Sequence, residues 1–250
     1  MRDGTRTGKY MKHRIGQWFK NAKIQKKIMI IYICIGTIPI LLLGLFASGQ
    51  ERKTLMEREH RNIEDSVSQG ASQLKSQILV YNNLSDYIAF NQPISDVLIG
   101  DYDNIFSMYE QYTATVDPVL SSLKYFNPNI NQITIYLDKN IVKHDTMVDS
   151  LQTIEGEKWY RQNESSLSQK VKWIIDAENK TSFSARTMPI MEQNKQKGIL
   201  YLDVNYDSLF AGFDDISRDS YGLYIVDKKG NVLFEKDTFS ENTASKNNTK

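Results

Sequence analysis

The stretch FNPNINQITIYLD, residues 126–138, marks the change in fold along this chain of 250 residues. Asn127 and Pro128 stop a helix, because proline has no backbone N–H to donate and restricts the residue before it. From residue 132 to 138 apolar and polar side chains alternate, which is the period of a half-buried strand. The chain before this stretch has the spacing of helices and most of the chain after it has the spacing of strands, so we predict an α+β fold.

Two amphipathic helices are predicted before residue 126. In residues 50–90 the apolar side chains recur mostly at steps of three, four or seven: Ile63, Val67, Leu74, Ile78, Tyr81, Leu84 and Ile88. Pro93 would close this helix, and Asp101 or Asp103 would cap a second one. The long helix either packs on its own domain or forms a stalk that pairs with a second copy, and the spacing favours neither.

After the first strand, short elements alternate. We predict a short helix over 156–162, strands over 171–175, 182–190 and 198–204, and a helix beginning at Asn205 or Asp207. Two further apolar runs, 221–226 and 231–235, flank a turn in which Gly230 suits a positive φ, and they predict a hairpin. The hairpin either docks on the preceding domain or opens a further module, and we favour the second alternative because an isolated hairpin is marginally stable.

Residues 28–47, IMIIYICIGTIPILLLGLFA, contain no charged side chain. As a helix they would span about 30 Å, the thickness of the hydrocarbon core of a bilayer. Residues 1–27 carry nine Lys or Arg against Asp3. The positive-inside rule therefore predicts one transmembrane helix with the N-terminus in the cytoplasm and residues 48–250 outside the cell. A buried core helix and a cleaved signal peptide are the alternatives.

The rest of the sequence limits which binding and catalytic functions are expected of this chain. The basic lead fits an anionic membrane surface better than nucleic acid. The only cysteine, Cys34, lies in the apolar run, and the three histidines are far apart in the sequence. No G-x-S-x-G and no G-x-G motif occurs. We therefore expect no catalytic residues, no metal site and no cofactor in this chain.

Several short motifs share their order with one bacterial family. They are IQKKI at 24–28, IPI at 38–40, PNINQITIY at 128–136, KWY at 158–160, GILYLDV at 198–204 and YIVDKKGNVL at 224–233. Together they resemble the N-terminal sensing half of YesM-type sensor histidine kinases, which place a double Cache region outside the cytoplasm between two transmembrane helices. The resemblance covers essentially the whole chain.

The resemblance implies a single transmembrane helix, a long stalk helix, a PAS-like antiparallel Cache sheet and the opening hairpin of a second, incomplete Cache module. The corresponding domains are a basic cytoplasmic segment at 1–27, the transmembrane helix at 28–47, a membrane-distal Cache domain with its stalk at 48–217, and the start of the second module with a polar tail at 218–250. The chain departs from the family in having no second apolar run, no histidine box and no ATP-binding motif.

The implied function is ligand sensing by a membrane-anchored input region of a two-component sensor in the bacterial cell membrane. The expected partners are a small molecule such as a sugar or another nutrient, the membrane, a second copy in a homodimer, and a response regulator reached only through a protein-histidine kinase domain that this chain lacks. The alternatives are the input region of a chemoreceptor or cyclic-dinucleotide enzyme of the Cache type, and a stand-alone membrane-anchored binding protein.

The resemblance also implies a ligand pocket on the concave face of the sheet. The candidate ligand-binding residues are Tyr136, Trp159, Tyr160, Arg186 and Asp203. Aromatic rings would supply stacking area, and Arg186 and Asp203 would orient polar groups of the ligand. Trp159 and Tyr160 fit ordinary packing of a small helix on the sheet equally well, and Arg186 and Asp203 could instead form a surface ion pair.

Overall fold

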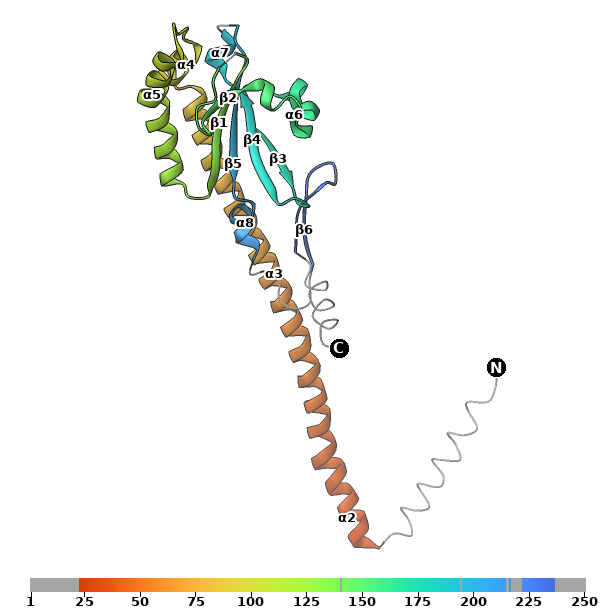
Figure 1. The fold of residues 1–250 in the computed structure, drawn as a ribbon. Coiled ribbons are helices and arrows are strands. Elements are labelled where there is room, and N and C mark those ends of the chain that lie inside the picture. Colours follow the sequence, from red (N-terminus) through yellow and green to blue (C-terminus); the bar gives the residue numbers. More distant parts are fainter. Residues whose placement is uncertain (1–22, 140, 194, 215, 217–221, 237–250) are drawn as a thin grey trace, which may run out of the picture. The chain divides into compact units, whose positions relative to one another are not determined.

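The computed structural model describes residues 23–139, 141–193, 195–214, 216 and 222–236 (Figure 1). The chain divides into two compact units, Met1–Ile63 and Glu64–Lys250. Most of the predicted basic segment and the whole of the predicted polar tail, residues 240–250, lie outside the described residues.

The first unit divides the apolar run among three helical segments. These are α2 (Ile24–Tyr32), a π-helical turn (Ile33–Thr37) and the beginning of α3 (Ile38–Ala89). Pro39 has no N–H to donate within this helical stretch, and the adjacent Ile38 N–H bonds five residues back to the Ile33 oxygen.

The predicted transmembrane helix over 28–47 is wrong. Within the described residues, no helix combines the length and the apolar character needed to span a bilayer. α2 is only 9 residues long. In α3 the apolar residues at the beginning of the helix are followed by the charged residues Glu51, Arg52 and Lys53. The location derived from that helix, a single-pass protein of the cell membrane with residues 48–250 outside, is corrected with it.

Three helices form one side of the second unit. α3 continues to Ala89 and is followed by α4 (Gln92–Ile99) and α5 (Ile105–Phe126). Asn91 caps α4 by accepting the Ile94 N–H, and Pro93 therefore lies in the first turn of α4 and not at the end of α3. α5 is capped by Asn104, which accepts the Ser107 N–H, and not by either predicted aspartate.

A five-stranded sheet forms the other side. Its strands are β1 (Ile130–Leu137), β2 (Val148–Ser150), β3 (Lys172–Asp176), β4 (Thr181–Thr187) and β5 (Gly198–Val204), in the spatial order β2-β1-β5-β4-β3. The sheet is mixed and not antiparallel as predicted, because β2 runs parallel to β1. The chain reverses near Asp145, which has a φ of 49°, and His144 bridges Val148 across that reversal.

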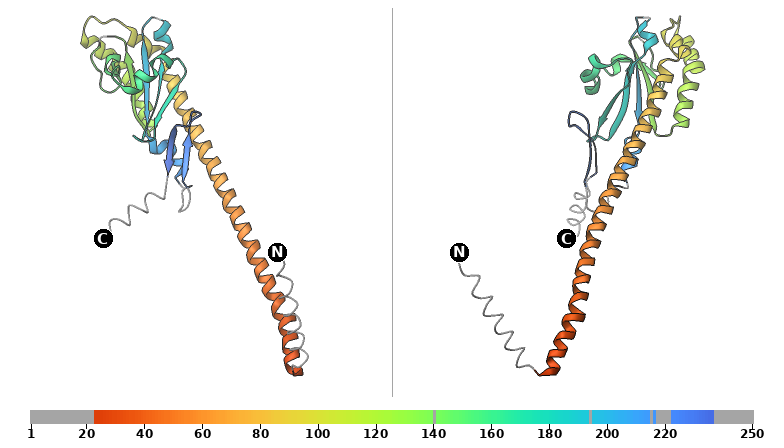
Figure 2. Two further views of the ribbon diagram at one scale, coloured as in Figure 1. Left: turned by 90° about the vertical axis from the view of Figure 1, so that its right-hand side faces the viewer. Right: turned by 180° about the vertical axis from the view of Figure 1, so that it is seen from behind.

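The sheet has a buried face against the helices (Figures 1 and 2). The inward residues of β1 and β5 pack with those of α3, α4 and α5 in one apolar core; among them are Ile133, Ile135, Leu137, Leu200, Leu202, Val204, Ile88, Leu98, Tyr112, Val116 and Leu120. Leu74, Ile78 and Leu84 of α3 pack against this core. The second half of α3 therefore packs on its own domain, and pairing with a second copy stays a prediction.

Short helices occupy the connections between strands. They are a 3-10 turn at Leu151–Thr153, α6 (Lys158–Asn163), a 3-10 turn at Glu164–Ser166, α7 (Pro189–Gln193), α8 (Tyr206–Phe210) and a 3-10 turn at Ala211–Phe213. α6 lies on the side of the sheet away from α5 (Figure 2). Asn205 caps α8 by accepting the Ser208 N–H, so the helix begins at the first of the two predicted positions, Asn205 and not Asp207.

Two glycines meet where α3 passes the turn after α8. A β-carbon placed on Gly70 would lie 2.8 Å from the Gly212 oxygen and 2.8 Å from the Phe213 ring. A β-carbon on Gly212 would lie 2.9 Å from the Gln73 side-chain oxygen. Real side chains do not tolerate the contacts at Gly70, so the close approach of these two segments depends on glycine.

The predicted hairpin is formed by β6 (Leu223–Val226) and β7 (Val232–Lys236). Gly230 has a φ of +86° in its turn. Phe234 is buried and stacks on Phe210 with ring centroids 4.9 Å apart, and the Tyr206 hydroxyl donates to the Leu233 carbonyl. The hairpin thus docks on the preceding elements, and the opening of a second module stays a prediction.

Candidate ligand-binding site

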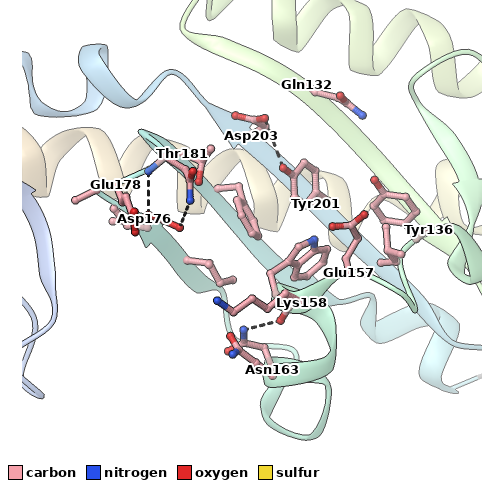
Figure 3. A pocket seen from close by; sticks show the side chains of 18 of the residues that line it. Gln132, Tyr136, Glu157, Lys158, Asn163, Asp176, Glu178, Thr181, Tyr201 and Asp203 are labelled. Carbon is pink, nitrogen blue, oxygen red and sulfur yellow. Dashed lines mark hydrogen bonds between the residues drawn. The ribbon is translucent and has the colours of Figure 1, made fainter.

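A broad cavity of about 1120 Å³ lies on the face of the sheet opposite α3 (Figure 3). β1, β3, β4 and β5 form its base, and residues 153–163, which include α6, form one wall. Its polar lining residues outside the strands include Thr153, Glu157, Lys158, Gln162, Asn163 and Asn179. No His, Cys, Ser or Arg is among the lining residues that the structure describes.

Four aromatic rings form the floor of this cavity. Tyr136 comes from β1, Phe183 from β4, Tyr201 from β5 and Trp159 from α6. The ring centroids of Phe183 and Tyr201 are 4.8 Å apart, and Trp159 lies 5.1 Å from Phe183 and 5.7 Å from Tyr201. Tyr136 is 6.1 Å from Tyr201. We call this cluster the aromatic floor.

Strand register explains why the three strand residues meet. Side chains two apart on a strand share a face, so Tyr201 and Asp203 of β5 point into the cavity together. β4 pairs antiparallel with β5, so that Phe183 is opposite Asp203 and Ala185 is opposite Tyr201. The small Ala185 leaves Phe183 and Tyr201 close enough to pack diagonally.

Asp203 is a half-buried acid at the Tyr201 end of the site. The Asn131 amide donates to Oδ1 at 3.0 Å, and the Tyr201 hydroxyl lies 3.5 Å from Oδ2. Burial raises the pKa of Asp203 above the ordinary value for aspartate, although both of these bonds oppose the shift. No Lys or Arg nitrogen of the described chain approaches Asp203 within 4.0 Å.

The β3 end of the cavity is more polar. Asp176 accepts hydrogen bonds from the backbone and side chain of Asn179, at 3.1 and 2.8 Å, and these bonds lower its pKa. Lys158 lies near enough for its charge to lower the pKa of Asp176 further. The two ends of the cavity therefore hold their carboxylates differently, with internal donors and a cation near Asp176 and a desolvated surrounding for Asp203.

Three of the five predicted site residues lie together on the cavity: Tyr136, Trp159 and Asp203. Tyr160 is buried behind Trp159, donates from its hydroxyl to Glu164 at 3.0 Å and accepts from Lys197 at 2.8 Å. Its ring completes a small core with Leu151, Ile154, Ala185 and Ile199. Tyr160 therefore supports the aromatic floor from behind.

Arg186 lies on the opposite face of the sheet. Its guanidinium pairs with Asp86 of α3 and lies 5.4 Å from the centroid of the Phe90 ring. The predicted ligand-binding role of Arg186 in this cavity is therefore wrong, and the alternative, a surface pair with Asp203, does not form either. Arg186 is an odd number of residues from Phe183 on β4, so its side chain points away from the cavity.

Phe183, Tyr201, Gln132 and Glu157 line the cavity but are missing from the predicted set. The alternation within 198–204 contains the signal for Tyr201, because it shares a face with the predicted Asp203. Phe183 could be placed only after the pairing of β4 with β5 was known.

No metal centre is indicated: in the described part of the chain, no three His, Cys, Asp or Glu side chains are grouped to hold an ion. Comparison with family models, with curated proteins and with solved structures gives no match to this chain.

Proposed function

We propose that the second unit is a ligand-binding sensor domain, the input region of a signalling protein of the kind that the sequence resembles. The observation that carries this proposal is the cavity of about 1120 Å³ over the aromatic floor. Concave sites with an aromatic lining and a few convergent polar groups are typical of small-molecule binding. The lining offers stacking surface together with hydrogen-bonding groups such as Gln132 and Asn163.

Binding is favoured over catalysis by the identity of the lining side chains. Nucleophilic catalysis needs an activated Ser, Cys, Thr or Lys next to a base, usually His. The lining contains Thr153, Thr181 and Lys158, and the described structure pairs none of them with a histidine. A sensing role for the cavity needs only recognition.

Strand β4 offers a route from the cavity to α3. Phe183 contacts the cavity on one face of β4, and Arg186, three residues on, pairs with Asp86 of α3 on the other. A ligand that displaces the Phe183 end of β4 would change the position of Arg186 and thereby favour one of two placements of α3. Such coupling requires that the ligand bind the two placements with different affinity.

The test is a thermal-shift screen of the purified chain with sugars, amino acids, amines and small carboxylates. A true ligand should raise the free energy of unfolding by about 2.7 kcal/mol at a hundredfold excess over its dissociation constant. Tyr201→Ala should abolish the shift, and the matched control Tyr125→Ala, which truncates a tyrosine 81% exposed on α5, should retain it.

Circular dichroism of both variants establishes that they fold. The proposal is overturned if no compound in the screen shifts the parent protein, or if folded Tyr201→Ala responds as the parent does.

A further inference from the structure

The walls of the cavity carry charge of mainly one sign. Six carboxylates line it: Asp149, Glu157, Asp176, Glu178, Asp203 and Glu235. Lys158 is the one basic side chain among the described lining residues. An anionic ligand would meet repulsion from most of this wall and would find no guanidinium to bind it.

Only one of the six acids has a basic partner within 4.0 Å in the described residues. That acid is Asp149, whose carboxylate lies 3.2 Å from the Lys143 ammonium. Asp203 and Glu157 are without such a partner, although Asp203 is half buried. A carboxylate removed from water without a counter-charge is unfavourable, so this end of the cavity would gain from a bound cation.

Burial and, to a lesser extent, the negative charge of these acids raise the pKa values of two tyrosines of the aromatic floor. Burial is the main cause that raises the pKa of Tyr201, and the negative charges of Asp203 and Glu157 raise it further. Burial likewise raises the pKa of Tyr136, with added contributions from Asp149 and Glu157. Lys158 acts instead on Asp176, at the other end of the cavity. The Tyr136–Tyr201 end is thus both aromatic and negative.

An organic cation satisfies both properties at once. The face of an aromatic ring carries partial negative charge and attracts an ammonium group, most strongly for Trp, and a desolvated site strengthens this attraction. A neutral sugar could stack on the same rings but would leave the carboxylates uncompensated. A carboxylate or phosphate ligand would be opposed by both.

We infer that the cavity takes a small organic cation, with its alkylammonium group on the faces of Trp159 and Tyr201 and its charge beside Asp203 and Glu157. This inference rests on the proposed function, because it names the chemical class of the ligand of that same site. The opposite end, around Asp176 and Asn179, would bind the polar remainder of the molecule.

The test compares matched probes that differ only in charge. Choline is titrated against its carbon isostere, in which a tert-butyl group replaces the trimethylammonium group, and putrescine is titrated against butanediol. Binding is followed in the full chain by calorimetry and by the NMR signal of the Trp159 indole. We expect at least one cation to bind about tenfold more tightly than its neutral partner. Added salt should lower the affinity for the cation and leave the affinity for the neutral partner unchanged.

Variants locate the charge that matters. Asp203→Asn should reduce the affinity for the cation about tenfold and leave the neutral partner unchanged. Glu110→Gln is the matched control, since it removes an exposed carboxylate of α5 that does not line the cavity, and it should change the affinity for the cation by less than about threefold.

Equal or tighter binding of the neutral partners, or an unchanged cation affinity in folded Asp203→Asn, would overturn the inference. The inference also falls, and the proposed function stands, if neither cation binds while the broader screen finds a neutral or anionic ligand that depends on Tyr201. If the screen finds no ligand at all, the proposed function fails with it.

Discussion

The two faces of the five-stranded sheet are built from the same strands but solve different problems. On the face toward the helices, β1 and β5 present aliphatic side chains such as Ile135 and Leu202, which are fully buried. On the other face the same strands present Tyr136, Tyr201 and Asp203, which remain partly accessible in the cavity. Burial on the helix-facing side contributes most of the free energy of unfolding, and the other side retains accessible surface that a ligand could cover.

The difference shows how closely the two tasks are joined. Leu202 lies between Tyr201 and Asp203 on β5, so one strand both anchors the core and presents the site. A substitution on one face that moves the backbone of β5 therefore also moves the side chains on the other face. Neighbouring residues of β5 lie on opposite faces of the sheet. We therefore expect a substitution on one face to affect only stability, or only the site, when it leaves the backbone of β5 in place.

The largest effect should come from the helix-facing side. Leu202→Ala removes a fully buried side chain from the central strand and should lower the free energy of unfolding by about 3 kcal/mol, through lost burial and the cavity that remains. Tyr201→Phe, one residue away on the other face, keeps its ring and should cost no more than about 1 kcal/mol. Urea unfolding followed by circular dichroism measures both. Equal losses would show that the two faces do not differ in this way.

A smaller effect is expected at the ion pair that joins β4 to α3, between Arg186 and Asp86. Asp86→Ala leaves the buried Arg186 guanidinium without its carboxylate and should cost about 1 to 3 kcal/mol, since Asp86 itself is half exposed. Arg186→Met keeps much of the volume and removes the charge, so its cost should be smaller. A greater loss in Arg186→Met, measured in the same unfolding experiment, would show that packing on Phe90 and not charge pairing dominates here.

The smallest effect is a pH dependence from the cavity side. The folded pKa of Asp203 is raised by burial, so the folded protein binds a proton there more readily than the unfolded chain. The resulting stabilisation is fully present below about pH 4, the ordinary aspartate value, and is lost as the pH rises through the folded pKa. Asp203→Asn should remove this decline and be at least as stable as the parent protein at neutral pH.

Unfolding midpoints across this pH range provide the measurement, and Asp65→Asn, on the exposed surface of α3, is the control that should keep the decline. A decline of the same size in Asp203→Asn would assign the effect to another acid.

Periodicity predicted most of the local structure because each pattern reports its own buried face. The strand over 198–204 and the hairpin with Gly230 in its turn agree with the structure. The boundaries were less accurate where two signals competed: Asp101 and Asp103 both suit a helix cap, but Asn104 holds that position. The apolar run at 28–47 had a composition suited to one long helix, and its division among three segments was not in the pattern.

The site was only partly predictable, because it depends on which strands are neighbours. Tyr136 and Asp203 share a face of the sheet through the pairing of β1 with β5, and the alternation alone placed each residue correctly on its own strand. Arg186 was assigned to the wrong face, since nothing in the sequence fixes the register of β4 against β5. The parallel placement of β2 likewise depends on the chain reversal near Asp145.

The contact between Gly70 and Gly212 also limits how α3 can move within its domain. Rotation about the helix axis would bring Gln69 or Ala71 toward the Gly212 oxygen, and sliding along the axis would bring Val67 or Leu74 there. Both motions replace a glycine by a side chain at a point that has no room for one. Tilting about the crossing keeps the two glycines together, so it is the motion of lowest steric cost. We therefore expect any motion of α3 within its domain to pivot at this contact, and a substitution at Gly70 to change that motion as well as the stability of the domain.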